Sequence, residues 1–225
     1  MAPDYVYVHD SVADELLALL KKEIEATYGG SSAQKTSPDF ARAVDMGAFD
    51  RLKKLTDLTL QPGVAKTLSG GEFDFTEKYV APTVITNVKT SDALMSQEIF
   101  GPILPVLRYK DLNEVIQYIQ GQDKPLALYV FGHNQKQIDK ILSQTSSGAA
   151  VINNLVVHLV NPYAPFGGVG GSGQGSYHGE FGFKAFSHER TVMKQSSIGI
   201  THWLYPPYTS WKFKVGMWFL RFLSR

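Results

Sequence analysis

Residues 103 to 152 alternate between apolar runs and short helical patterns, and this alternation leaves few possible folds. Two segments with helical spacing separate three apolar, strand-like runs, at 103–109, 126–131 and 149–152. Asp111 and Asn134 stand where the N-cap residues of the two helices would lie. Short strands joined through helices pair in parallel and carry the helices on the sheet faces. We therefore predict an α/β fold, doubly wound, with a mostly parallel sheet and flanking helices.

The first 28 residues predict a strand followed by a helix. The run at 6–9 is strand-like, and a helix is expected to start at Ser11 with Asp14 as its capping-box partner. Its apolar face would consist of Val12, Leu16, Leu20 and Ile24. Gly29 and Gly30 would end this helix.

The next sixty residues predict a loop, a helix and two strands. Residues 30–40 are rich in Ser, Gly and Pro and are typical of a surface loop, whereas 49–58 have the spacing of a short helix. Strands are expected at 64–67 and 80–88. Pro82 implies that the second strand lies at a sheet edge or begins at that residue.

The composition excludes several classes of protein. These 225 residues contain no cysteine, which excludes disulfides, thiolate chemistry and cysteine-based metal sites within them. A net charge of +1 gives no electrostatic argument for nucleic acid, so we expect no such partner. The acidic residues near the start do not fit a secretory signal, and no apolar run reaches the roughly 18 residues of a transmembrane helix.

A glycine-rich stretch at 165–182 contains a formal G-x-G-x-x-G at Gly168, Gly170 and Gly173. A dinucleotide-binding loop needs a strand before this pattern and a helix directly after it, and prolines and further glycines flank it here. Ser172 lacks the flanks of a hydrolase nucleophile elbow. The stretch therefore predicts a loop that passes close to a ligand or to another part of the backbone.

Three histidines, His158, His178 and His188, could be considered as metal ligands. Their spacing matches no zinc pattern. We expect no metal site, and we expect these side chains to form local hydrogen bonds at loops or strand ends.

Ser96 to Pro105 read S-Q-E-I-F-G-P-I-L-P, which sets Glu98 and Phe100 beside a forced Gly-Pro turn. Such a turn can hold a carboxylate and a ring at the mouth of a cleft. Further along the chain this run is followed, in order, by K-P-L-A-L-Y-V-F, S-S-G, V-I-N-N, P-F-G-G-V-G-G-S-G and Y-H-G-E-F-G-F-K-A-F-S-H. The ordered set, with A-P-D-Y at the start and Y-V-A-P-T-V at 79–84, resembles the aldehyde dehydrogenase superfamily. Y-H-G, F-S-H and L-Y-P-P-Y resemble its fatty-aldehyde (class 3) branch.

The resemblance implies roles for six residues. Glu98 would accept hydrogen bonds from the ribose on the nicotinamide side of NAD or NADP, and Phe100 would pack near the nicotinamide. Asn153, Asn154, His158 and Phe166 would line the substrate tunnel. The glycines after Phe166 would close over the site, and residues 191–194 would form a strand that pairs across a dimer.

The resemblance also implies that several catalytic parts lie upstream of residue 1. The family's nucleophilic cysteine would fall just before Met1, and the general-base glutamate, the oxyanion asparagine and the dinucleotide-binding domain would precede it. Since a thiohemiacetal needs a thiolate, these residues alone are expected not to oxidise aldehydes. We expect the catalytic-domain half of an aldehyde dehydrogenase, cut at the cysteine, with residues 1–188 as the catalytic-type domain and 189–197 as the oligomerisation strand.

Residues 198–225 form an aromatic and basic tail. As a helix, 211–225 would be apolar almost all round, apart from a basic stripe of Lys214, Arg221 and Arg225. Fifteen residues of helix span about 22 Å, which is shorter than the roughly 30 Å hydrocarbon core, so we expect attachment at the membrane surface. The alternative is a tail docked on the body of the protein or on a partner. An intracellular location is expected, peripheral on the endoplasmic reticulum, a lipid droplet or the mitochondrial outer membrane.

Three functions remain open from the sequence. The first is an oxidoreductase half that acts on long-chain aldehydes only with its missing segment. The second is a non-catalytic protein that forms a homodimer, or a heterodimer with a full-length relative. The third is a membrane-bound module that binds acyl chains without chemistry.

Overall fold

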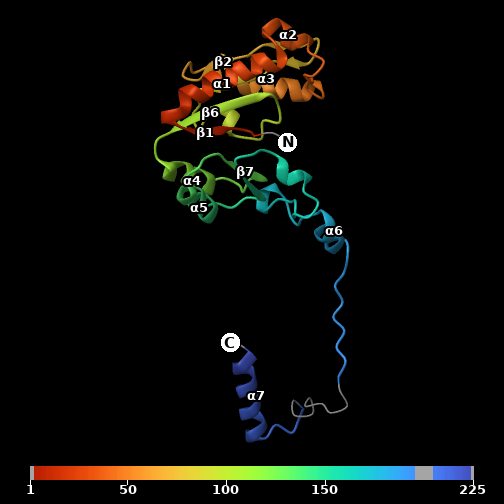
Figure 1. Ribbon diagram of the computed structural model, residues 1–225. Helices are drawn as coiled ribbons and strands as arrows, with labels where there is room; N and C mark the ends of the chain where they lie inside the picture. Colours follow the sequence, from red (N-terminus) through yellow and green to blue (C-terminus); the bar gives the residue numbers. More distant parts are fainter. Residues whose placement is uncertain (1–2, 196–204, 224–225) are drawn as a thin grey trace. The chain divides into compact units, whose positions relative to one another are not determined.

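The computed structural model describes residues 3–195 and 205–223. The chain divides into two compact units, Met1–Ala185 and Phe186–Arg225 (Figure 1). The first unit is an α/β structure, as predicted.

A four-stranded sheet forms the centre of the first unit. Its strand order is β1 (Val6–His9), β6 (Ile103–Tyr109), β5 (Thr83–Thr86) and β2 (Lys66–Ser69). β6 pairs in parallel with β1 and with β5, and β2 is antiparallel to β5. β3 (Phe73–Asp74) and β4 (Tyr79–Val80) form a separate antiparallel pair.

The parallel pairing predicted for 103–152 holds in part. β7 (Ala127–Val130) and β8 (Ala149–Ile152) pair in parallel, in a two-stranded sheet of their own. β6 cannot pair with β7 because β1 and β5 already occupy both of its edges. The expectation of one sheet through this region is therefore wrong, since strand alternation does not say which edges are already taken.

Seven α-helices and three 3-10 helices are described in residues 3–195 and 205–223. The α-helices are α1 (Asp10–Tyr28), α2 (Ser31–Thr36), α3 (Met46–Leu60), α4 (Leu112–Gln120), α5 (Gln135–Gln144), α6 (Gly179–Ala185) and α7 (Ser210–Leu223). The 3-10 helices are η1 (Ala93–Met95), η2 (Val157–Val160) and η3 (Gly170–Ser172). Asp111 and Asn134 cap α4 and α5 through their side chains, as predicted.

Neighbouring residues of β5 point to opposite faces of the sheet, and each face has its own core. Ile85 is fully buried in a cluster with Leu52 of α3, whereas Val84 belongs to a cluster with Ala13 and Leu17 of α1. Helices therefore cover both faces of the sheet, which is the doubly wound arrangement that the sequence predicted.

The start of α1 differs from the prediction. The helix begins at Asp10, one residue before the predicted start. Its N-cap is His9, whose side chain accepts the capping hydrogen bond from the Ser11 N–H. Asp14 forms an ion pair with Arg108 of β6 instead of closing a capping box. Val12 is 49% exposed and lies outside the core, because the buried stripe runs through Ala13 and Leu17.

Two further expectations upstream need correction. Residues 30–40 are not all loop, because they contain α2, whose Lys35 pairs with Asp74 of β3 at 2.5 Å. Residues 80–88 are not one strand, since β4 ends before Pro82 and β5 begins after it. β5 is a central strand that begins at Thr83, one residue after Pro82. The alternative of a strand start near Pro82 therefore holds to within one residue, and the edge-strand alternative is wrong.

Among the described residues of the second unit, Ser210–Leu223 form the helix α7, which matches the helix predicted for the tail. Residues 189–195 are exposed and have no regular secondary structure, so the expected strand at 191–194 is not formed within a single chain. Residues 196 and 197 of that prediction, and Arg225 of the basic stripe, lie outside the described residues. Pairing between two copies remains a prediction.

Candidate functional site

Glu98 and Phe100 lie on the segment that joins η1 to β6. Both side chains are exposed, and the Phe100 ring is 77% exposed. Between them, Ile99 is only 1% exposed and belongs to the core cluster that contains Leu52. The alternation presents an acid and a ring to solvent while the residue between them fastens the segment to α3.

The backbone of this segment is tightly fixed. Phe100 has a φ of 48°, in the left-handed region that non-glycine residues rarely adopt. A Cβ on Gly101 would lie 2.6 Å from both methyl carbons of Leu52, so any larger residue there would force the Leu52 side chain to move. The Pro102 carbonyl accepts a 2.8 Å hydrogen bond from the Thr83 N–H of β5. The Gly-Pro turn thus joins the Glu98–Phe100 segment to both the helix and the sheet.

Asn153 lies directly after β8, and its side chain is already engaged. Its φ is 55°, and its Oδ1 accepts from the Gly132 N–H at 2.8 Å while its Nδ2 donates to the Gly132 carbonyl at 2.9 Å. Gly132 follows β7, so the amide links the ends of the two strands. Asn154 is exposed, and its Oδ1 accepts from the neighbouring Leu155 N–H at 2.8 Å. Of these two predicted tunnel residues, Asn153 holds the backbone and Asn154 remains open to solvent.

His158 and Phe166 are brought together in a cluster of rings. Their ring centres are 5.5 Å apart, and His178 stacks on Phe166 at 5.9 Å. Tyr129 lies 6.0 Å from His158, and Tyr177 lies 5.4 Å from Phe166. The five rings pack against one another, and Phe166 is only 8% exposed. The tunnel-lining role of His158 and Phe166 stays a prediction.

The expectation that the histidines form local hydrogen bonds is wrong for His158. Both of its ring nitrogens are buried without a hydrogen-bond partner among the described residues, and so is Nδ1 of His178. Both rings pack beside the Phe166 ring, with centre-to-centre distances of 5.5 Å for His158 and 5.9 Å for His178. Burial also raises the pKa of the Tyr129 hydroxyl, although the Val156 backbone partly opposes this shift.

The glycine-rich stretch is a loop closed by its own backbone, as predicted. Phe166 and Tyr177 exchange backbone hydrogen bonds of 3.1 and 2.9 Å at its base. A Cβ on Gly168 would lie 2.1 Å from the Ser172 carbonyl oxygen, so glycine is needed for the close approach of two backbones. The 3-10 helix η2 and a turn lie between β8 and this loop, which rules out a strand directly before it.

Sequence reasoning did not assign site roles to Tyr129, Tyr177 and His178. Each lies in a run that carries the family resemblance, K-P-L-A-L-Y-V-F or Y-H-G, and that was the available signal. Their contact with His158 and Phe166 depends on how the loop after β8 folds back, which periodicity does not encode.

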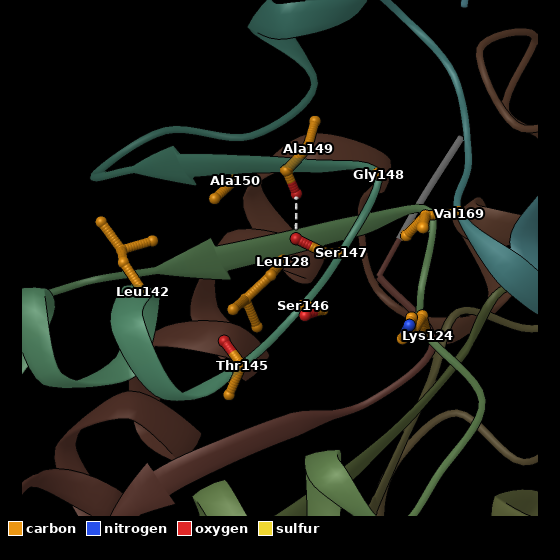
Figure 2. A pocket seen from close by; sticks show the side chains of 10 residues that line it. All are labelled: Lys124, Leu128, Leu142, Thr145, Ser146, Ser147, Gly148, Ala149, Ala150 and Val169. Carbon is orange, nitrogen blue, oxygen red and sulfur yellow. Dashed lines mark hydrogen bonds between the residues drawn. The ribbon is translucent and has the colours of Figure 1, made fainter. Parts of the chain in front are cut away.

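A pocket of about 460 Å³ lies beside β7 and β8 and is shown in Figure 2. It is lined by Lys124, Leu128, Leu142, Val169 and the run from Thr145 to Ala150. Ser147 donates a 2.8 Å hydrogen bond to the Ala149 carbonyl, drawn as the dashed line. None of the six predicted site residues lines this pocket.

Comparison with known proteins decides the family. The sequence profile described as "Aldehyde dehydrogenase family" matches residues 1–192. The chain belongs to the aldehyde dehydrogenase family.

Among its relatives, aldehyde dehydrogenase family 3 member A2 of Rattus norvegicus is 37% identical over 222 residues, covering 98% of this chain and 44% of the relative. The dimeric NADP-preferring aldehyde dehydrogenase of Rattus norvegicus is 40% identical over 198 residues, covering 88% of this chain and 42% of the relative. These matches confirm the resemblance to the class 3 branch.

A solved structure titled "Substrate bound state of Staphylococcus Aureus AldH" superposes with a TM-score of 0.85 and 38% identity. The superposition covers 97% of this chain and 46% of that one. The chain thus spans less than half the length of these relatives and shares the fold of the part that it matches.

Proposed function

We propose that this chain provides the nicotinamide-side contacts and part of the substrate wall of an NAD- or NADP-dependent enzyme that oxidises long-chain aldehydes to carboxylic acids. The observation that carries the proposal is the exposed pair Glu98 and Phe100 on a rigid backbone. Family membership implies NAD or NADP as the cofactor.

The residues present fit that cofactor. The exposed Glu98 carboxylate offers acceptors for two neighbouring ribose hydroxyls, and the exposed Phe100 ring offers a flat apolar surface for a nicotinamide. When bound, NAD or NADP would supply the acceptor for the hydride that leaves the aldehyde carbon. The part of Glu98 and Phe100 is to hold the nicotinamide end in one orientation.

The ring cluster is suited to an apolar substrate. His158 and Phe166 pack ring against ring, and both His158 nitrogens are buried rather than open to water. An alkyl chain against this wall would lose water contact at little polar cost, which favours long-chain over short polar aldehydes. The preference for long chains is part of the proposal.

These 225 residues contain no cysteine, so the proposed chemistry needs a thiolate from another segment. The chain would be mixed with a long-chain aldehyde and NAD or NADP, alone and with a separately expressed segment that matches the upstream part of a family 3 relative. We expect turnover only in the mixture, and we expect Glu98→Gln and Phe100→Ala to reduce it. Turnover by the 225-residue chain alone would overturn the proposal.

We further propose that α7 attaches the protein to a membrane surface. Its large apolar side chains are exposed, including Phe213 at 68%, Trp218 at 66% and Phe222 at 66%. Its 14 residues span about 21 Å, and no helix among the described residues is long and apolar enough to cross a bilayer. Aromatic rings with Lys214 close by suit the interface between headgroups and acyl chains.

Vesicle binding tests this attachment. The chain would be sedimented with vesicles of phosphatidylcholine alone and with added phosphatidylglycerol, beside a variant that lacks residues 209–225. We expect the full chain to bind the anionic vesicles more strongly, with a blue shift of tryptophan emission, and we expect the shortened variant to remain in solution. Equal binding by both proteins would contradict the proposal.

We also propose that residues 191–194 of two copies of this chain pair as strands in a dimer. Val192 is 76% and Met193 91% exposed in a stretch without regular structure, which leaves its backbone groups available to a partner strand. Light scattering after gel filtration would give a dimer mass for the full chain. A Val192→Pro variant, which breaks strand pairing, should give a monomer mass.

A further inference from the structure

The Glu98–Phe100 segment receives little support from its own side chains. Two of its three side chains are exposed, and Phe100 is held at a φ of 48°. A left-handed non-glycine residue persists only where the surroundings enforce it. The orientation of Glu98 and Phe100 must therefore be set through the backbone.

Arg51 of α3 contacts that backbone directly. Its Nη1 donates to the Glu98 carbonyl at 2.9 Å, and its Nη2 donates to the Ile99 carbonyl at 2.6 Å. A guanidinium is planar and permanently charged, so its two nitrogens fix two acceptors in one geometry. The charge strengthens both hydrogen bonds. Arg51 thereby fixes two consecutive peptide units immediately before the strained residue.

Asp4 holds the same peptide from the other side. Its Oδ1 accepts from the Ile99 N–H at 3.1 Å, across 95 positions of sequence. Asp4 lies two residues before β1, at the end of the chain where the family resemblance puts the nucleophile just upstream. The bond therefore ties the chain segment next to the expected nucleophile to the segment that carries Glu98 and Phe100.

We propose that Arg51 and Asp4 are positioning residues, which set the orientation of Glu98 and Phe100 toward a nicotinamide nucleotide. They act through the Ile99 backbone and need not touch the nucleotide. The inference rests on the proposed role of Glu98 and Phe100 as the cofactor-binding pair. It adds two residues that are required for that role, Arg51 on α3 and Asp4 just before β1.

The test uses the whole 225-residue chain and two NMR measurements, amide exchange of Ile99 and Phe100 and titration with nicotinamide mononucleotide. The variants are Arg51→Gln, Arg51→Lys and the matched control Lys54→Met, an exposed lysine on the same helix. We expect Arg51→Gln to speed exchange of both amides and to weaken nucleotide binding about tenfold, equivalent to about 1.4 kcal/mol. Arg51→Lys should recover part of both effects, since its ammonium can reach one carbonyl at a time. Lys54→Met should match the wild type.

Asp4 is tested with a conservative pair. Asp4→Asn keeps an oxygen that can accept from the Ile99 N–H, so exchange of that amide should stay slow. Asp4→Ala removes the acceptor and should speed it. A far-ultraviolet circular dichroism spectrum like that of the wild type shows in each case that the variant is folded.

The outcomes distinguish failure of the positioning role of Arg51 and Asp4 from failure of the cofactor role of Glu98 and Phe100. Unchanged amide exchange and unchanged nucleotide affinity in Arg51→Gln would overturn the positioning role. If the nucleotide shifts no signal of Glu98 or Phe100 in the wild type, the proposed cofactor role is overturned. In that case amide exchange still decides whether Arg51 and Asp4 hold the segment.

Discussion

Replacing Asn153 tests whether this residue holds the ends of β7 and β8 together. Its amide exchanges two hydrogen bonds with the Gly132 backbone, and its φ is 55°. Each bond contributes about 0.5–1.5 kcal/mol net, so losing both costs about 1–3 kcal/mol. Alanine tolerates the left-handed region less well than asparagine, which adds roughly 1 kcal/mol. We expect Asn153→Ala to lower the free energy of unfolding by about 2–4 kcal/mol.

Two further variants separate the cost of the lost hydrogen bonds from the cost of the left-handed backbone. Asn153→Gly loses the same hydrogen bonds but adopts a positive φ freely, which removes the strain of roughly 1 kcal/mol. Its looser unfolded state costs about 0.4–1 kcal/mol, so it should be at most about 0.6 kcal/mol less costly than alanine. Asn154→Ala is the matched control, because within residues 3–195 and 205–223 its side chain forms one hydrogen bond, to the adjacent Leu155 N–H. We expect this control to change stability by less than about 1 kcal/mol.

Urea unfolding followed by far-ultraviolet circular dichroism measures these differences. Tryptophan fluorescence is unsuitable because Trp203, Trp211 and Trp218 all belong to the second unit. The reasoning fails if Asn153→Ala unfolds within about 0.5 kcal/mol of the wild type, which is the range of an ordinary surface change. It also fails if Asn154→Ala is as costly as Asn153→Ala.

Three other predictions concern packing and pH. Gly101→Ala should destabilise by about 1–3 kcal/mol through its clash with Leu52, and a Leu52→Val background should lessen that cost in urea unfolding. Hydrogen bonds from Lys35 and then Thr76 hold the pKa of Asp74 far below its usual range. The ionised Asp74 therefore stabilises the folded state above about pH 4, and this contribution to the free energy of unfolding is lost as the pH falls further. Asp74→Asn should therefore flatten the acid side of a stability–pH curve. Burial, aided by Tyr118 and Asp4, raises the pKa of Tyr5 from 10.0 to about 12. The contribution of the neutral Tyr5 hydroxyl to folding stability is therefore fully present below pH 10.0 and is lost as the pH rises through about 12. Tyr5→Phe should flatten the alkaline side when unfolding is followed by phenolate absorbance.

The sequence by itself determined the features that depend on near neighbours. Asp111 and Asn134 cap the helices predicted after them, because a cap is a contact across two or three residues. Helices on both faces of the central sheet followed from the alternation of strands and helices. The ordered motifs around Glu98 and Phe100 indicated the aldehyde dehydrogenase family, and the comparisons confirm it.

Only the tertiary structure decided the contacts between distant residues. β6 is enclosed by β1 and β5, so the strands predicted as one sheet form two. The Asn153 side chain meets Gly132 across 21 positions, and Arg51 reaches the Glu98 carbonyl across 47. Local patterns specify which residues can form a helix or strand, whereas such contacts depend on how those elements pack. Because of that packing, the motif residues Glu98 and Phe100 form an exposed pair on a backbone held by distant residues.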